Sequence, residues 1–232
     1  MSPPSLDPRL LRLLRAVVEA HTRDAQPVGS QTIVDLGLFE VSSATIRNWF
    51  AELDAAGYLA QPHTSGGRIP TETGYQLYVQ TFIEDKPLSK APTQSLEKAL
   101  EPLHDLGPRA KALARFVSDL TELAVFVRFG PADTYYTGLS QLFAQPEFRD
   151  WERVVSLSEV LDRLDDALHG LPAPPFERPR LFLGQESPFG SSCSTVCIGQ
   201  KGMLVGILGP LRMNYQLAYS ALRTAERALF SL

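Results

Sequence analysis

The sequence predicts an α+β protein of two domains, the first mainly helical with a short β-ribbon and the second built on a mainly antiparallel sheet. Residues 41–75 indicate the first domain, because they join a capped helix, a glycine stop and two short strands around a glycine-rich turn. Residues 181–208 indicate the sheet, because they contain short apolar strands separated by turn residues. The segment KPLSKAP at 86–92 is typical of a linker. We therefore expect domains at 1–86 and 96–232, joined by a linker at 87–95.

The first domain opens with two predicted helices. Asp7 can cap a helix over residues 8–21, with Pro8 in the first turn, where a missing amide hydrogen costs no helical bond. A short helix then starts at Ser30 and runs through Leu36, and Gly37 interrupts the chain. The apolar stripe of the first helix consists of Leu10, Leu13, Leu14, Val17 and Val18.

The third predicted helix has the features of a DNA-recognition helix. Ser42 or Ser43 can cap it, and Gly57 can end it in a left-handed conformation. Its predicted buried face, at the i, i+4, i+7 spacing, consists of Ile46, Phe50 and Leu53. Thr45, Arg47 and Asn48 then point away from that face, and Arg can bind guanine and Asn adenine through paired hydrogen bonds. The competing interpretation is an ordinary surface helix with a solvated arginine.

The segment after this helix favours the DNA-binding interpretation. Residues 58–61 read as a strand, 62–68 as a turn, and Ile69 as the start of a returning strand, with Pro70 confining the ribbon to an edge. Alone, this would be a plain hairpin; after two helices and a recognition helix it completes a winged helix-turn-helix. The expected DNA contacts are Ser42, Ser43, Thr45, Arg47 and Asn48 on the helix, and His63, Thr64, Ser65 and Arg68 on the ribbon.

A fourth helix is expected from Thr71 to about Lys86, with apolar residues spread too widely for a single core stripe, so part of it should pack on a partner subunit or the next domain. The second domain should contain helices, strands and a closing amphipathic helix. The helices are expected at 96–106, 109–121, much of 150–168 and 214–231. The strands are expected at 124–129, 181–184, 194–199 and 203–208, with a strand turning into a helix over 135–143 and a hairpin turn at 199–202.

Charge and composition limit the possible functions. The net charge is −4, and residues 1–86 carry seven Lys or Arg against ten Asp or Glu, a net −3. Non-specific attraction to DNA should therefore be weak, so a DNA-binding chain must concentrate its cations on one face and act as a dimer. No apolar run is long enough to span a bilayer, and the start lacks a signal-peptide pattern, so we expect a cytoplasmic protein.

The reactive residue types do not form a recognisable site for catalysis or for a cofactor. Cys193 and Cys197 lie on one face of a predicted strand and are expected to be buried free thiols. The four histidines match no motif for a metal or a nucleophile, and no phosphate-binding glycine loop is present. We therefore expect no catalytic residues, no metal and no cofactor.

Several motifs resemble the heat-inducible transcription repressors of the HrcA type. They are PVGS at 27–30, SSATIRN at 42–48, QPHTS at 61–65, GRIPT at 67–71, GY at 74–75, YTGLS at 136–140, PEF at 146–148 and GILGPLRMNY at 206–215. The resemblance runs through both domains in order. It implies a winged-helix DNA-binding domain followed by a GAF-like regulatory and dimerisation domain.

The same resemblance implies a function and partners. A homodimer would bind an inverted-repeat operator in double-stranded DNA upstream of chaperone operons, depend on a GroEL-type chaperonin to reach its active fold, and leave DNA on heating. Family members carry an inserted dimerisation domain before the YTGLS segment, whereas here the strand at 124–129 is followed almost at once by Gly138, as in a shortened form lacking most of the insert. Trp49 and Phe50 stand where the family has a smaller pair. The alternative function is a winged-helix regulator whose C-terminal domain senses a small molecule in an apolar pocket.

Overall fold

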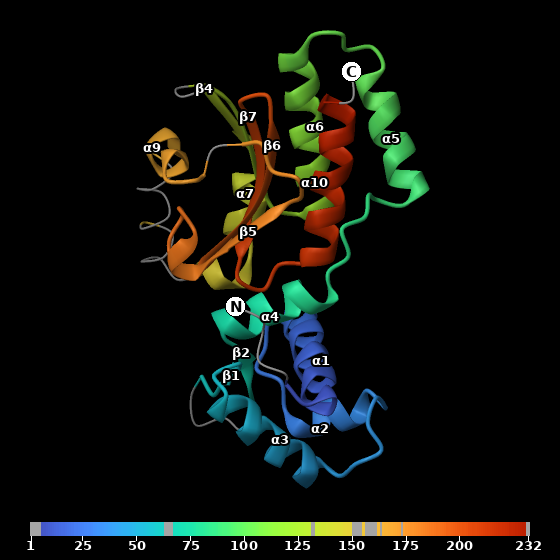
Figure 1. The fold of residues 1–232 in the computed structure, drawn as a ribbon, viewed down its shortest axis with the longest axis vertical. Helices are drawn as coiled ribbons and strands as arrows, with labels where there is room; N and C mark the ends of the chain where they lie inside the picture. The colour runs from blue at the N-terminus through green and yellow to red at the C-terminus, as the bar shows by residue number, and fades with distance from the viewer. Residues whose placement is uncertain are drawn as a thin grey trace. The chain divides into compact units, whose positions relative to one another are not determined.

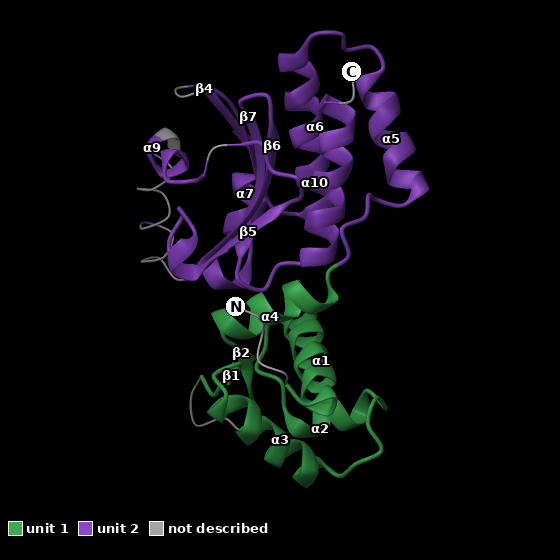
Figure 2. Ribbon diagram, in the orientation of Figure 1, with its two compact units in different colours: residues 1–83 green, residues 84–232 purple. Residues whose placement is uncertain are grey.

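The computed structural model describes residues 6–62, 67–130, 133–149, 155, 162, 164–172 and 174–230. The chain divides into two compact units, residues 1–83 and 84–232 (Figure 2). Helices combined with an antiparallel sheet confirm the predicted α+β class. Among the described residues, no helix has both the length and the apolar character needed to cross a membrane.

Unit 1 begins with α1 (Pro8–Asp24), whose start matches the predicted cap. An Asp7 carboxylate oxygen accepts a hydrogen bond from the Arg9 amide at 2.9 Å. The helix runs three residues beyond the predicted end, because Ala25 adopts a left-handed φ of 53° and its amide closes the last turn on the His21 carbonyl. The predicted stripe is buried, with exposures from 0% to 6% for Leu10, Leu13, Leu14, Val17 and Val18.

Two further helices precede the ribbon: α2 (Ser30–Asp35) and α3 (Ser43–Ala55). The predicted buried face of α3 is confirmed, since Ile46, Phe50 and Leu53 are at most 2% exposed. Gly57 ends the helix region with a φ of 78°.

The ribbon consists of β1 (Leu59–Ala60) and β2 (Ile69–Pro70), which pair antiparallel. The next element, α4 (Glu72–Phe82), begins where Thr71 Oγ1 accepts the Gly74 amide at 3.0 Å and donates to the Gly57 carbonyl at 2.6 Å. Gly74 permits a close approach of the chain, since a Cβ there would lie 2.2 Å from the Tyr58 carbonyl oxygen. The cap and this approach together fix where α4 leaves the ribbon.

Unit 2 is organised around a five-stranded antiparallel sheet in the order β4-β3-β7-β6-β5. The strands are β3 (Ala124–Gly130), β4 (Asp133–Thr137), β5 (Arg180–Leu183), β6 (Cys193–Gln200) and β7 (Met203–Pro210). The predicted hairpin turn is confirmed between β6 and β7, where Lys201 and Gly202 have φ values of 51° and 83°. Such a pair of positive φ values matches the twist of the two strands.

Helices cover both faces of this sheet (Figure 1). On one side lie α6 (Leu106–Thr121) and α10 (Tyr215–Phe230), with α5 (Lys90–Leu100) against α6. On the other side lie α7 (Leu139–Phe143), a 3-10 turn (Pro146–Arg149) and α9 (Leu164–His169). Most of the helix expected over 150–168 lies outside the described residues.

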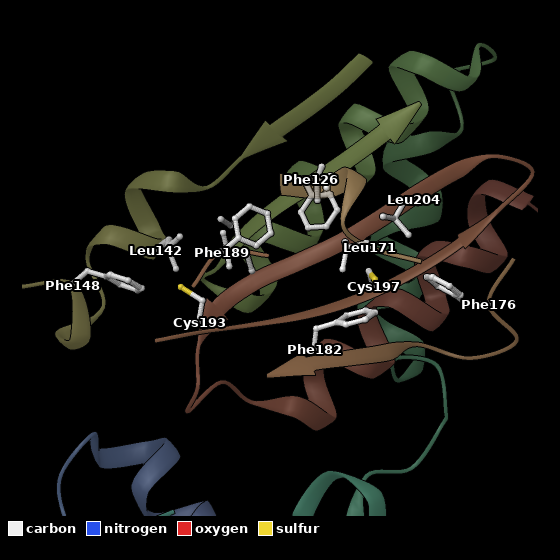
Figure 3. Packing of buried hydrophobic residues seen from close by; sticks show 13 residues of the cluster. Phe126, Leu142, Phe148, Leu171, Phe176, Phe182, Phe189, Cys193, Cys197 and Leu204 are labelled. Atoms are coloured by element: carbon white, nitrogen blue, oxygen red, sulfur yellow. The ribbon is translucent and has the colours of Figure 1, made fainter. Parts of the chain in front are cut away.

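A cluster rich in aromatic side chains fills the space between the sheet and the side of α7 and α9 (Figure 3). The rings of Phe126 and Phe189 lie 5.9 Å apart within it. Cys193 and Cys197 both belong to it, which confirms that they share a strand face. Burial raises the pKa of each thiol to about 12, so both stay protonated at neutral pH.

The structure differs from the prediction at the expected linker, 87–95, because α5 already begins at Lys90. Pro92 was read as a linker residue, but it is the third residue of α5. A proline is tolerated there, since first-turn amides have no partner within the helix. The residues before α5 are also held in place, with the Leu88 amide donating to Thr224 Oγ1 at 2.8 Å.

Candidate nucleic-acid interface

The start of α3 is built by hydroxyl groups. The Ser42 hydroxyl accepts the Thr45 amide at 3.2 Å, and the two hydroxyl oxygens lie 3.1 Å apart. Ser42 is therefore the cap, and Ser43 is the first helical residue. The side chains of the first turn are short, so an approaching phosphate would meet little steric hindrance.

The exposed face of α3 carries Arg47 and Asn48, opposite the buried Ile46 and Phe50. The Nε of Arg47 donates to the Ser30 hydroxyl of α2 at 3.3 Å. This bond engages one edge of the guanidinium, and the neutral hydroxyl leaves its charge uncompensated. The neighbouring Ala44 and Ala51 are also exposed and do not project beyond the two polar side chains.

The ribbon residues predicted to touch DNA fall into two groups. His63, Thr64 and Ser65 lie outside the described residues. Arg68 is described, and its Nε binds a carboxylate oxygen of Asp54 on α3 at 2.6 Å. The side chains of Arg68 and Asp54 are only 17% and 28% exposed, so this ion pair is partly buried. Sequence reasoning missed the pair because no local spacing relates a ribbon residue to one fourteen positions earlier.

The backbone of Arg68 is fastened as well. Its amide and carbonyl exchange hydrogen bonds of 2.9 and 2.8 Å with the carbonyl and amide of Val28, in the loop before α2. Arg68 therefore joins the ribbon to that loop by its backbone and to α3 by its side chain. The other carboxylate oxygen of Asp54 is buried and accepts no hydrogen bond from the described residues. Among the described residues, Arg68 therefore supplies the hydrogen bond and the opposite charge to the Asp54 carboxylate.

Ion pairing separates the arginines of unit 1 into two classes. Arg9, Arg15, Arg23 and Arg68 each form an ion pair with a carboxylate, at 2.6 to 3.2 Å. Among the described residues of this unit, the arginines that donate hydrogen bonds to neutral oxygens are Arg12, bound to the Leu38 carbonyl at 3.1 Å, and Arg47, bound to the Ser30 hydroxyl. The sequence holds a signal for Arg15, which has Glu19 four residues later, whereas Arg12 has Ala16 at that position.

An aromatic stack fixes the side of α3 next to α1. The guanidinium of Arg9 lies 5.5 Å from the centre of the Trp49 ring, and Trp49 meets Phe39 edge to face at 5.8 Å. The guanidinium of Arg12 lies 5.3 Å from the Phe39 ring in turn. Trp49 thus packs beside α1 while Phe50 enters the core, which accounts for two consecutive large residues at this point.

No cluster of three or more His, Cys, Asp or Glu suited to a metal ion occurs in the described part of the chain.

The surface ion pairs of unit 1 shift the pKa values of their members in the directions expected for opposite charges. The hydrogen bond with Glu19 raises the pKa of Arg15, and that with Arg23 lowers the pKa of Asp24.

Comparison with known proteins identifies relatives. The family model described as "HrcA protein C terminal domain" matches residues 75–218. The heat-inducible transcription repressor HrcA of Arthrobacter sp. (strain FB24) is 42% identical over 123 residues, which are 53% of this chain and 36% of that protein. HrcA of Mycobacterium sp. (strain KMS) is 40% identical over 130 residues, 56% of this chain and 38% of that protein. The match therefore spans little more than a third of the length of these relatives.

A solved structure shares the fold over nearly the whole chain. A crystal structure titled as that of a hypothetical protein superposes with a TM-score of 0.79 and covers 97% of both chains. Its sequence identity is 17%, so this likeness supports the fold alone.

Proposed function

The chain belongs to the HrcA family, and on that premise we propose that it is a heat-inducible transcription repressor in which unit 1 is a winged helix-turn-helix that binds operator DNA. One observation carries the proposal: α3 presents Arg47 and Asn48 to solvent while its opposite face is fully buried. The relatives named above are described as heat-inducible transcription repressors, which favours this proposal.

The proposed contacts divide by chemistry. Arg47 and Asn48 read base edges in the major groove, because each side chain can form two hydrogen bonds with one base. Ser42, Ser43 and Thr45 lie at the helix start and contact the backbone phosphates, which position the helix without reading sequence. His63, Thr64 and Ser65 at the ribbon tip contact phosphates or the minor groove.

For Arg68 we propose a different role from direct contact. Its guanidinium is bound to Asp54 and only 17% exposed, so its charge is largely neutralised within the protein. We propose that Arg68 positions the ribbon against α3, so that helix and ribbon meet the same stretch of DNA.

The acidic composition requires a second subunit. Unit 1 contributes few uncompensated positive charges, so two copies on an inverted-repeat operator are needed for useful affinity. We propose that unit 2, with a GAF-like fold, supplies regulation and dimerisation in the cytoplasm, that the operators precede chaperone genes, and that a GroEL-type chaperonin assists folding. Warming would loosen the ribbon early, because its strands have two residues each.

The proposal is tested by gel-shift assays on a palindromic chaperone promoter at low and high temperature. Arg47→Ala should weaken binding by about 1–3 kcal/mol, or roughly 5- to 150-fold. Arg23→Ala is the matched control, since it removes the same charge from an exposed residue that forms an ion pair with its neighbour Asp24. Binding that survives Arg47→Ala unchanged, or that does not fall on heating, would contradict the proposal.

The small-molecule alternative finds little room on the face of the sheet that carries Phe126 and Phe189. The cavity bounded by Phe126, Tyr136 and Phe189 holds only about 10 Å³, which is room for one water molecule. Small-molecule sites occupy roughly 300–1,000 Å³. The phenylalanine-rich core thus occupies this face, and the alternative gains no support there.

A further inference from the structure

A larger cavity lies elsewhere in unit 2 and is lined by residues of α5, the start of α6 and the C-terminal half of α10. Its volume of about 640 Å³ is within the range of small-molecule sites. It is separate from the phenylalanine-rich core, and all of its lining residues belong to unit 2. The nature of its walls indicates what it can bind.

The walls carry opposite charges on different helices. Arg227 on α10 and Arg109 on α6 are positive, whereas Glu97 on α5 and Glu101 at its C-terminal cap are negative. Among the described residues, no ion pair within 4.0 Å joins these walls. A fifth charged residue, Lys90, lies at the other end of α5, roughly 16 Å from Glu101. The lining of the cavity therefore contains cations and anions that do not form ion pairs with one another among the described residues.

The charge of Arg109 is held rigidly. One terminal nitrogen donates to the carbonyls of Leu100 and Leu103 at 3.0 and 2.9 Å, and the other donates to the carbonyl of Ala228 at 3.1 Å. These carbonyls belong to the ends of α5 and α10, where helices need donors. The Nε of Arg109 is buried and has no hydrogen-bond partner among the described residues. The side chain is thus fixed without a carboxylate.

The apolar lining continues into the segment that follows unit 1 in the chain. Leu88 lines the cavity beside Leu96 and Leu100. The segment 84–88, which we call the strap, is fastened to α10 at three points. The Glu84 backbone and the Gln216 amide exchange hydrogen bonds of 2.9 and 3.0 Å, Asp85 pairs with Arg223, and the Leu88 amide binds Thr224. A ligand in the cavity would therefore contact the strap.

We infer that this cavity binds a small amphipathic zwitterion with the chemistry of a short apolar peptide. Its carboxylate would pair with Arg227 beside the fixed charge of Arg109, its ammonium with Glu97 or Glu101, and its side chains with the leucines. A purely apolar ligand would desolvate both charged walls without compensation. A simple anion would leave the acidic wall unpaired, so a zwitterion fits both walls best.

The test uses calorimetric titration of the full chain without DNA, with dileucine as the probe. N-acetyl-dileucine lacks the ammonium, and dileucine amide lacks the carboxylate. We expect dileucine to bind and each blocked peptide to bind roughly tenfold or more weakly, because each has lost a charge-assisted contact. Hydrogen exchange of the Leu88 amide should also slow when dileucine is bound.

Variants of the cavity residues test which side chain binds each end of the ligand. Arg227→Gln should abolish the preference for dileucine over its amide, and the double variant Glu97→Gln, Glu101→Gln should abolish the preference over the acetylated peptide. Lys98→Gln is the matched control, since Lys98 is exposed on α5 and does not line the cavity.

Three results would overturn the inference: no dileucine binding, equal binding of the blocked forms, or the same effect from Arg227→Gln and Lys98→Gln. The inference that the cavity binds dileucine is independent of the proposed function. Any regulatory role of that binding rests on the proposed function. A chain that binds dileucine but not operator DNA would therefore refute the proposed function alone.

Discussion

Replacing Asp54 by Ala separates the two possible roles of Arg68. If Arg68 contacts DNA directly, removing an acidic residue beside it should leave operator affinity unchanged or raise it, because DNA is negatively charged. If Arg68 positions the ribbon through Asp54, the same substitution should lower affinity about as much as Arg68→Ala. The two roles thus predict changes of opposite sign.

The size of the effect on stability follows from the burial of the pair. Arg68 and Asp54 are 17% and 28% exposed and 2.6 Å apart, which places them between surface and fully buried ion pairs. Removing one partner leaves the other partly buried and unpaired, at a cost of about 2 kcal/mol. For a unit of this size, that cost should lower the Tm by roughly 8–16 °C.

The assay is urea denaturation followed by Trp49 fluorescence in a Trp151→Phe background, so that the signal reports unit 1. Arg68→Ala, Asp54→Ala and the double variant form a double-mutant cycle, and their operator affinities are measured in parallel below the unfolding range. Additive losses of stability, or an operator affinity that rises in Asp54→Ala and falls in Arg68→Ala, would refute the positioning role.

Further predictions concern packing and buried thiols. Gly74→Ala should destabilise unit 1 by about 1–3 kcal/mol in the Trp49 denaturation assay, because its Cβ would lie 2.2 Å from the Tyr58 carbonyl oxygen. Gly107→Ala in unit 2, with no atom within 4 Å of the added Cβ, should be neutral or slightly stabilising when urea denaturation of the whole chain is followed by circular dichroism. Cys193 and Cys197 should resist iodoacetamide at pH 8 in the native chain and react on unfolding, since burial raises both pKa values to about 12; rapid native labelling would contradict this. Because these folded-state pKa values exceed those of the unfolded chain, their contribution to stability should be complete below pH 9 and lost progressively up to pH 12. The loss should be up to about 1.4 kcal/mol per pH unit for each thiol, measured by denaturation at each pH against Cys193→Ala and Cys197→Ala.

Local sequence signals account for much of the fold. The caps at Asp7 and Ser42 and the buried face of α3 follow from short-range rules, because each depends on residues within one or two helical turns. The β6–β7 hairpin follows from its turn residues in the same way. The proposed recognition residues Arg47 and Asn48 belong to this class, since their exposure follows from helical periodicity.

Features that depend on distant residues were not predictable. The pairing of Arg68 with Asp54 and that of Arg223 with Asp85 join separate elements, so neither leaves a periodic signal. The early start of α5 was missed because a proline normally indicates a break, although its position in the first turn makes it harmless. The cavity beside Arg109 depends on how three helices meet and also could not be derived from local patterns.

The strand order β4-β3-β7-β6-β5 has a consequence for synthesis of the chain. Strand β3 finds one neighbour at once in β4, but its other neighbour, β7, emerges roughly 80 residues later, which takes roughly 4 to 16 s on the ribosome. During that interval the apolar residues of β3 lack β7, which pairs with β3 along its length in the finished fold. A nascent chain with this topology therefore exposes apolar, aggregation-prone surface for seconds. This exposure gives a physical reason for the proposed dependence on a chaperonin.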